Sequence, residues 1–115
     1  MHELSLAGGI VRLVEDAAER ERFRRVSLLR LEAGALSGVE VRALRFALEA
    51  SVPGTCLEGA EILIDEPPGT AWCLGCGRSV EIGSRADACP SCGGFRLQPT
   101  DGTELRVVDL MVHDD

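Results

Sequence analysis

The chain has 115 residues and a mass of 12.3 kDa, enough for one domain or for one domain that carries a small metal-stapled module. Apolar residues make up 45% but aromatic residues only 3%, so a folded core must consist mainly of aliphatic side chains. The net charge of −7 argues against binding to nucleic acid, and the longest apolar runs are too short to span a membrane. The first three residues lack the features of a signal peptide, so we expect a cytoplasmic protein.

In chain order, the hydrophobic periodicity first predicts a helix from Leu4 to about Arg20, where apolar residues recur at steps of three and four. Gly8 and Gly9 interrupt this helix. Such a pair indicates either a close approach of another backbone or a weak first half of the helix. The branched residues from Val26 to Glu32 then predict a strand.

Ser37 and Glu40 have the spacing of a capping box, which predicts a second helix that begins after Ser37 and ends before Pro53. Two further strands are expected, one from Ala60 to Glu66 and one from Glu104 to Val112. A cysteine-rich segment separates these two strands. They could therefore pair as the two arms of an enlarged hairpin.

Four of the five cysteines form two pairs, with two residues inside each pair and twelve residues between the pairs: Cys73, Cys76, Cys89 and Cys92. A glycine follows each pair and permits the positive φ of a tight turn. Two such knuckles predict a tetrahedral site of four thiolates, for which zinc is the usual occupant. Iron in a rubredoxin-like site stays an alternative because geometry does not distinguish the two metals. A thioredoxin-type redox pair fits less well, since the pairs are matched and lack a βαβ context.

The predicted fold class is α/β (α+β): a small three-stranded sheet with two helices that carries an inserted zinc-ribbon module. Residues 69–98 would form the ribbon, and residues 1–68 and 99–115 would form the α/β domain. Trp72 directly precedes the first knuckle, and we expect its side chain to pack within the ribbon. Cys56 lies outside the ribbon and is expected to be a free, partly buried thiol.

His2 makes the start of the chain a second candidate metal site. The α-amine of Met1 and the amide and imidazole nitrogens of His2 can chelate one ion, and the amide of Glu3 can complete a square plane. Square-planar nitrogen ligation suits Ni(II) or Cu(II). The alternative is that His2 is an ordinary surface histidine.

Several segments together resemble the HypA/HybF family of hydrogenase maturation factors. These segments are Met1–Leu6, Gly54–Ala60, the two cysteine knuckles and Glu104–Val108. The resemblance implies a metallochaperone and not an enzyme, with nickel as cargo at Met1, His2 and Glu3 and structural zinc at the four cysteines. The resemblance also implies that the protein interacts with a HypB-type GTPase and with the large subunit of [NiFe]-hydrogenase. For some members of the family, it implies interaction with urease maturation proteins.

Two other functions stay open from the sequence alone. A zinc-ribbon adaptor that binds nucleic acid or a protein machine would show salt-dependent nucleic-acid binding, which the charge of −7 disfavours. A rubredoxin-like electron carrier would be a red, redox-active iron protein.

Glu40 occupies a place where some relatives offer a carboxylate near nickel, although a capping role explains it more simply.

Overall fold

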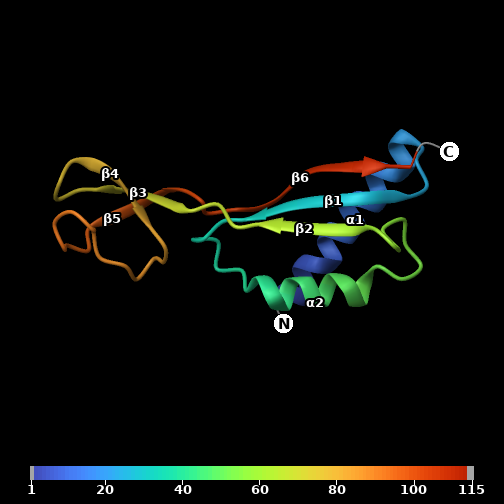
Figure 1. The fold of residues 1–115 in the computed structure, drawn as a ribbon, viewed down its shortest axis with the longest axis horizontal. Coiled ribbons are helices and arrows are strands. Elements are labelled where there is room, and N and C mark those ends of the chain that lie inside the picture. The colour runs from blue at the N-terminus through green and yellow to red at the C-terminus, as the bar shows by residue number, and fades with distance from the viewer. Residues whose placement is uncertain (1, 114–115) are drawn as a thin grey trace. The chain divides into compact units, whose positions relative to one another are not determined.

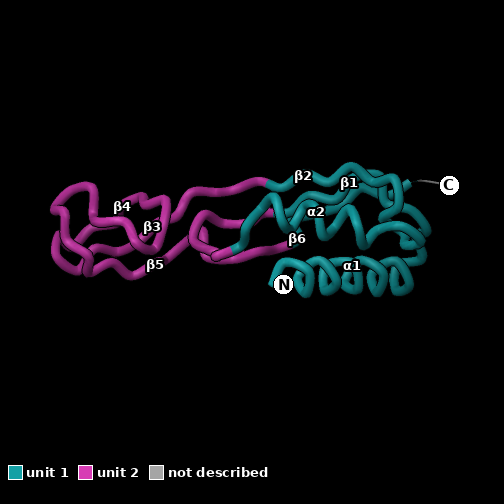
Figure 2. The backbone as a smooth tube through the Cα atoms, turned by 90° about the horizontal axis from the view of Figure 1, so that it is seen from below, with its two compact units in different colours: residues 1–31, 39–64, 107–115 teal, residues 32–38, 65–106 magenta. Residues whose placement is uncertain are grey.

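The computed structural model describes residues 2–113 and divides the chain into two compact units (Figure 2). Unit 1 comprises residues 1–31, 39–64 and 107–115, and unit 2 comprises residues 32–38 and 65–106. Among the described residues, no helix has both the length and the apolar character needed to cross a membrane.

Unit 1 is organised around a three-stranded sheet with the order β2-β1-β6. The strands are β1 (Val26–Ala33), β2 (Glu61–Asp65) and β6 (Leu105–Val112). Figure 1 shows β1 and β2 pointing in the same direction and β6 pointing in the opposite direction. A parallel pair needs a long crossover connection, which α2 (Val41–Ser51) supplies between β1 and β2. The expected pairing of the last two strands as a hairpin is therefore wrong, because β1 lies between β2 and β6.

The two helices bury the apolar faces that their sequence periodicity predicts. Helix α1 (His2–Glu21) packs against α2. These helices and the central strand supply an aliphatic core, which contains Ala7, Ile10, Val14 and Ala18 of α1, Leu44, Ala47 and Leu48 of α2, and Leu29 and Leu31 of β1.

Gly8 and Gly9 both lie inside α1. A Cβ atom added at either residue would have no heavy atom of a neighbouring segment within 4 Å. The interpretation that another backbone approaches this glycine pair is therefore wrong. The pair instead lowers the helix propensity of the first half of α1.

Helix α2 begins differently from the predicted capping box. Its N-cap is Glu40, whose carboxylate accepts a hydrogen bond from the Ala43 amide at 2.7 Å. Ser37 was expected at the N-cap, but its amide donates to the carbonyl of Gly34 at 2.9 Å in a turn that belongs to unit 2. The carboxylate of Glu40 thus replaces the serine hydroxyl as the capping group.

Unit 2 contains a second three-stranded sheet, with the order β4-β3-β5 and antiparallel pairing throughout. The strands are β3 (Gly69–Cys73), β4 (Arg78–Ile82) and β5 (Leu97–Asp101). One face of this sheet covers a small buried cluster of Leu36, Ala71, Cys73, Val80, Ile82 and Cys89. Leu36 comes from a segment more than thirty residues upstream of β3, and the sequence analysis did not anticipate its place in this core.

Three glycines allow segments of unit 2 that are distant in the sequence to approach one another closely. A Cβ atom on Gly34 would collide with the carbonyl of Gly102, and one on Gly69 would collide with the side chain of Leu36. Gly102 has a φ of +72° and would itself meet the carbonyl of Pro68 if it carried a Cβ atom. Only glycine fits at such contacts without moving the backbone.

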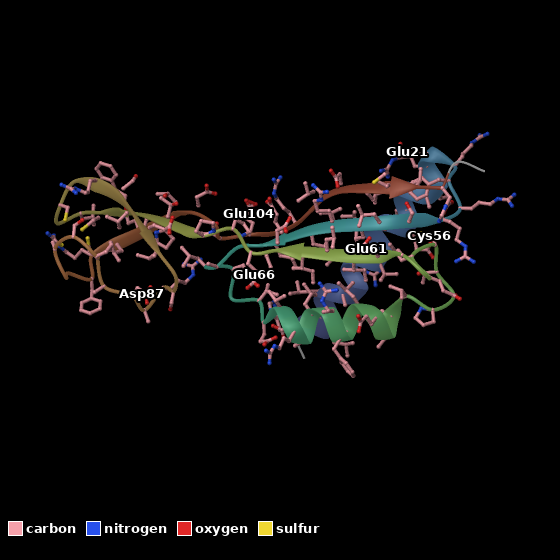
Figure 3. The ribbon with its side chains drawn as sticks, in the orientation of Figure 1. Glu21, Cys56, Glu61, Glu66, Asp87 and Glu104 are labelled. Atoms are coloured by element: carbon pink, nitrogen blue, oxygen red, sulfur yellow. The ribbon has the colours of Figure 1, made fainter. Side chains whose placement is uncertain are left out.

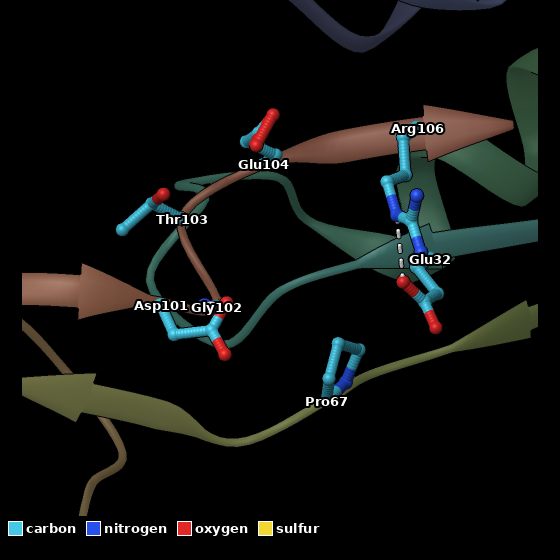
Figure 4. Close-up of a pocket in the computed structure, with 7 residues that line it drawn as sticks. All are labelled: Glu32, Pro67, Asp101, Gly102, Thr103, Glu104 and Arg106. Atoms are coloured by element: carbon cyan, nitrogen blue, oxygen red, sulfur yellow. Dashed lines mark hydrogen bonds and ion pairs between the residues drawn. The ribbon is translucent and has the colours of Figure 1, made fainter. Parts of the chain in front are cut away.

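Hydrogen bonds and an ion pair reinforce this glycine junction. The Leu36 amide donates to the carbonyl of Gly102 at 2.8 Å, which holds the residue that enters the ribbon core. Arg106 Nε donates to Glu32 Oε1 at 2.9 Å beside the same turn (Figure 4). The junction therefore fixes where the side chain of Leu36 enters the buried cluster of unit 2.

We expect Gly34→Ala to destabilise the protein by about 1–3 kcal/mol, because the added methyl group collides with the backbone of Gly102, which must shift to accommodate it. The matched control is Gly9→Ala, whose methyl group points into open space and should stabilise α1 by about 0.5–1 kcal/mol. Thermal unfolding of the zinc-loaded proteins, followed by circular dichroism, measures both changes. A Gly34→Ala variant as stable as the parent chain would contradict the close packing described here.

Candidate metal centres

The four paired cysteines of unit 2 converge at one point. Their Sγ atoms all lie within 4.8 Å of one another, and the Cys73–Cys92 and Cys76–Cys89 sulfur distances are both 3.7 Å. Four sulfurs placed tetrahedrally around a zinc ion at its usual bond length stand about 3.8 Å apart. A disulfide would instead need about 2.05 Å, and all five cysteines are free. The donor set therefore fits a single tetrahedral metal ion.

Two similar turns present these sulfurs. In the first knuckle, the Cys76 amide donates to Cys73 Sγ at 3.4 Å, and the Gly77 amide donates to the Cys73 carbonyl at 2.8 Å. Gly77 has a φ of +68°. The second knuckle repeats the pattern, with the Gly93 amide donating to the Cys89 carbonyl at 2.8 Å and Gly93 at a φ of +75°. The glycine after each pair thus adopts the left-handed conformation that its position predicted.

The surroundings of two of these sulfurs, those of Cys89 and Cys76, shift the pKa values of the two thiols in opposite directions. Amide hydrogen bonds from Cys92 and then Ser91 lower the pKa of the Cys89 thiol to about 6, although burial opposes them. A hydrogen bond with the Cys92 side chain and burial raise the pKa of Cys76 to about 12. Four clustered thiolates repel one another, so a bound cation is needed to keep them all ionised.

The fifth cysteine, Cys56, lies in unit 1, in the loop before β2 (Figure 3). Its side chain is free and buried, as the sequence analysis expected. Burial and the neighbouring Glu15 carboxylate raise the pKa of the Cys56 thiol to about 11. A thiol with so high a pKa stays protonated at neutral pH and is therefore a poor metal ligand.

The second candidate metal site lies at the start of α1. Met1 falls outside the described residues, so the structure gives no account of its α-amine. His2 is the first residue of α1, and its side chain is 67% exposed. The first amides of a helix have no intrahelical carbonyl to donate to. The amide nitrogens of His2 and Glu3 are thus placed beside an exposed imidazole.

The carboxylate of Glu3 has a role that the sequence analysis missed. Its Oε2 atom accepts a hydrogen bond from the Glu40 amide at 3.1 Å and lies 3.8 Å from His2 Nδ1. The hydrogen bond from Glu40 is the main reason that the pKa of Glu3 is lowered. It joins the start of α1 to the N-cap of α2. Nothing in the sequence links two residues that lie 37 positions apart.

Comparison with known proteins gives a consistent result. Residues 1–112 match the HypA family, described as "Hydrogenase/urease nickel incorporation, metallochaperone". The hydrogenase maturation factor HypA of Cupriavidus necator is 69% identical over 114 residues, which cover 99% of this chain and 96% of the relative. The protein of the same name from Polaromonas naphthalenivorans is 60% identical over 115 residues, the full length of both chains.

A solved structure supports the fold. The solution structure of the Ni metallochaperone HypA from Helicobacter pylori has a TM-score of 0.68 and covers 98% of both chains. Its sequence identity is only 17%, so this likeness concerns the fold alone. The predicted fold class, two helices with a small three-stranded sheet and a four-cysteine ribbon, is confirmed. The family inferred from the sequence is also confirmed: the chain belongs to the HypA family of hydrogenase/urease nickel-incorporation metallochaperones.

Proposed function

We propose that this chain holds Ni(II) at Met1, His2 and Glu3, delivers it during the maturation of [NiFe]-hydrogenase, and keeps structural zinc at Cys73, Cys76, Cys89 and Cys92. Membership of a nickel-incorporation family supports nickel as the cargo. The observation that carries the nickel site is the exposed imidazole of His2 in the first helical turn, beside amides that lack helical acceptors.

The position of this nickel site suits a carrier. Nitrogen ligands at an exposed chain end hold Ni(II) in a shallow site, from which a partner can take the ion. The carboxylate of Glu3 is already bonded to the Glu40 amide, so Glu3 would contribute its amide nitrogen and not its side chain. Glu40 is engaged in capping α2, and we assign it no role as a nickel ligand.

Zinc has a different role in this proposal. The buried cluster of unit 2 has only six residues, and two of them are cysteines of the sulfur cluster. So small a core supplies little folding free energy, and metal binding would supply most of the remainder. Unit 1 has its own aliphatic core. We therefore assign nickel to unit 1 and zinc to unit 2.

The proposed partners follow from the family resemblance. They are a HypB-type GTPase, the large subunit of [NiFe]-hydrogenase and, as a second client system, urease maturation proteins. The net charge of −7 disfavours nucleic acid as a partner. We place this non-enzymatic carrier in the cytoplasm, where thiols stay reduced and available to a metal.

The zinc assignment predicts unequal effects of two cysteine substitutions. Cys92→Ser removes one of the four sulfurs and should leave much less than one zinc ion per chain after gel filtration. The control is Cys56→Ser, which should keep one zinc ion, because its hydroxyl can still hydrogen-bond to Glu15 in place of the thiol. Elemental analysis measures the zinc content. Full zinc retention by Cys92→Ser, or iron in place of zinc in the parent chain, would refute the assignment.

The nickel assignment predicts that His2→Ala abolishes nickel binding. Calorimetric titration of the zinc-loaded chain, untagged at its N-terminus, should show one Ni(II) per parent chain and none for His2→Ala. Acetylation of the α-amine should have the same effect, because it removes another nitrogen ligand.

The matched control for His2 is His113, the other histidine of the chain. His113 is exposed, and its amide donates to the carbonyl of Arg25 at 3.0 Å. Its backbone contact survives the change His113→Ala, so nickel binding should equal that of the parent chain. If His113→Ala lost nickel and His2→Ala kept it, the N-terminal site would be wrong.

A further inference from the structure

The outer face of the unit 2 sheet exposes the single tryptophan of the chain. Along β3, Gly69, Ala71 and Cys73 are buried. Because side chains alternate along a strand, Trp72 lies on the opposite, outer face. Trp72 is 40% exposed, so more than half of its surface is covered even on this face. The expectation that Trp72 packs within the ribbon stays a prediction, because the strand register turns the residue away from the buried cluster while most of its surface is still covered.

The neighbours of Trp72 leave part of the residue exposed. On the two flanking strands, Ser79 of β4 and Gln98 of β5 lie directly opposite Trp72, and both are polar and exposed. The hydrogen bond from the Leu74 amide to the Arg96 carbonyl, at 2.9 Å, continues the β3–β5 ladder, so these two exposed residues form the next pair on the same face.

Two carboxylates lie one step further along the same face. Thr70, two residues before Trp72, faces Glu81 on β4 and, beyond a β-bulge, Asp101 on β5. Both acidic residues are exposed. Diagonal neighbours on one face of a regular sheet lie about 7–8 Å apart, which is the relation between Trp72 and Glu81. A basic segment that runs along this face from the indole to Thr70 can therefore reach the carboxylates on either side of Thr70.

An exposed indole beside two carboxylates matches a cationic side chain. A guanidinium or ammonium group gains energy over the face of tryptophan, and carboxylates form strong charge-assisted hydrogen bonds with it. A purely apolar partner would instead desolvate Glu81 and Asp101 without replacing their hydrogen bonds with water. An acidic partner would be repelled by both residues and by the net charge of −7.

We propose that this face, defined by Trp72, Glu81 and Asp101, docks an arginine- or lysine-bearing segment of a protein partner. The basic segment runs along the face, with a cation over the exposed part of the indole and its positive charge continuing towards the two carboxylates that flank Thr70. Tryptophan is one of the residue types that dominate binding energy at interfaces. The surface uses neither the N-terminal nickel segment nor a cysteine sulfur, although Trp72 directly precedes Cys73 in β3.

The single tryptophan makes this proposal directly measurable. The zinc-loaded full chain is titrated at low salt with a blocked peptide of alternating glycine and arginine while its tryptophan emission is recorded. The arginine peptide should change the emission saturably, and added salt should weaken binding severalfold. A twin peptide with neutral citrulline in place of each arginine should have no effect. Equal binding of both peptides, or no saturable change up to about 1 mM peptide, overturns the proposal.

Substitutions locate the site by calorimetry with the same arginine peptide. Trp72→Ala and the double variant Glu81→Gln with Asp101→Asn should each weaken binding about tenfold or more. Asparagine keeps the side-chain oxygen that accepts the Gly102 amide at 2.9 Å, so the local turn is preserved. The control is Phe95→Ala, which removes another exposed aromatic of unit 2 and should bind like the parent. Unchanged binding by Trp72→Ala, at equal zinc content, overturns the proposal.

Discussion

Unit 2 depends on the convergence of four sulfur atoms within 4.8 Å of one another. Within this cluster, amide hydrogen bonds lower the pKa of the Cys89 thiol to about 6, while hydrogen bonding with the Cys92 side chain and burial raise the pKa of Cys76 to about 12. A divalent metal ion removes this conflict by making every sulfur a ligand. The rest of the unit adds little apolar burial of its own, and part of that comes from Leu36, which the glycine junction holds in place. Metal binding and close backbone packing therefore supply the stability that a larger hydrophobic core would provide.

Unit 1 is organised on a different principle. Its core is aliphatic, and the start of α1 is tied to the start of α2 through the hydrogen bond between Glu3 and the Glu40 amide. This contact leaves the imidazole of His2 exposed while it fixes the residue that follows it. A cargo ion at His2 would bind to an exposed imidazole next to a residue, Glu3, that is anchored to the start of α2. Such an arrangement suits an ion that must be passed on.

The sequence was sufficient to predict much of the local structure and the spacing of the cysteine metal ligands. Helical periodicity, the strands β1, β2 and β6 and the two cysteine knuckles could be predicted, because each depends on residues close together in the chain. The ribbon strands β3, β4 and β5 were not predicted. The N-cap was misassigned locally, since Glu40 and not Ser37 accepts the Ala43 amide three residues later. Two features that were missed depend on distant contacts: Leu36 entered the ribbon core, and Glu3 bonded to the Glu40 amide. The order β2-β1-β6 likewise follows from a crossover that no local pattern specifies.

X-ray absorption at the nickel and zinc edges of one doubly loaded sample tests the central claim, two metals on two chemically distinct donor sets. The account predicts a nickel shell of nitrogen ligands with an imidazole signature and no sulfur. It predicts a zinc shell of four sulfurs at about 2.3 Å. Sulfur in the nickel shell would place the cargo at the cysteines and contradict the account.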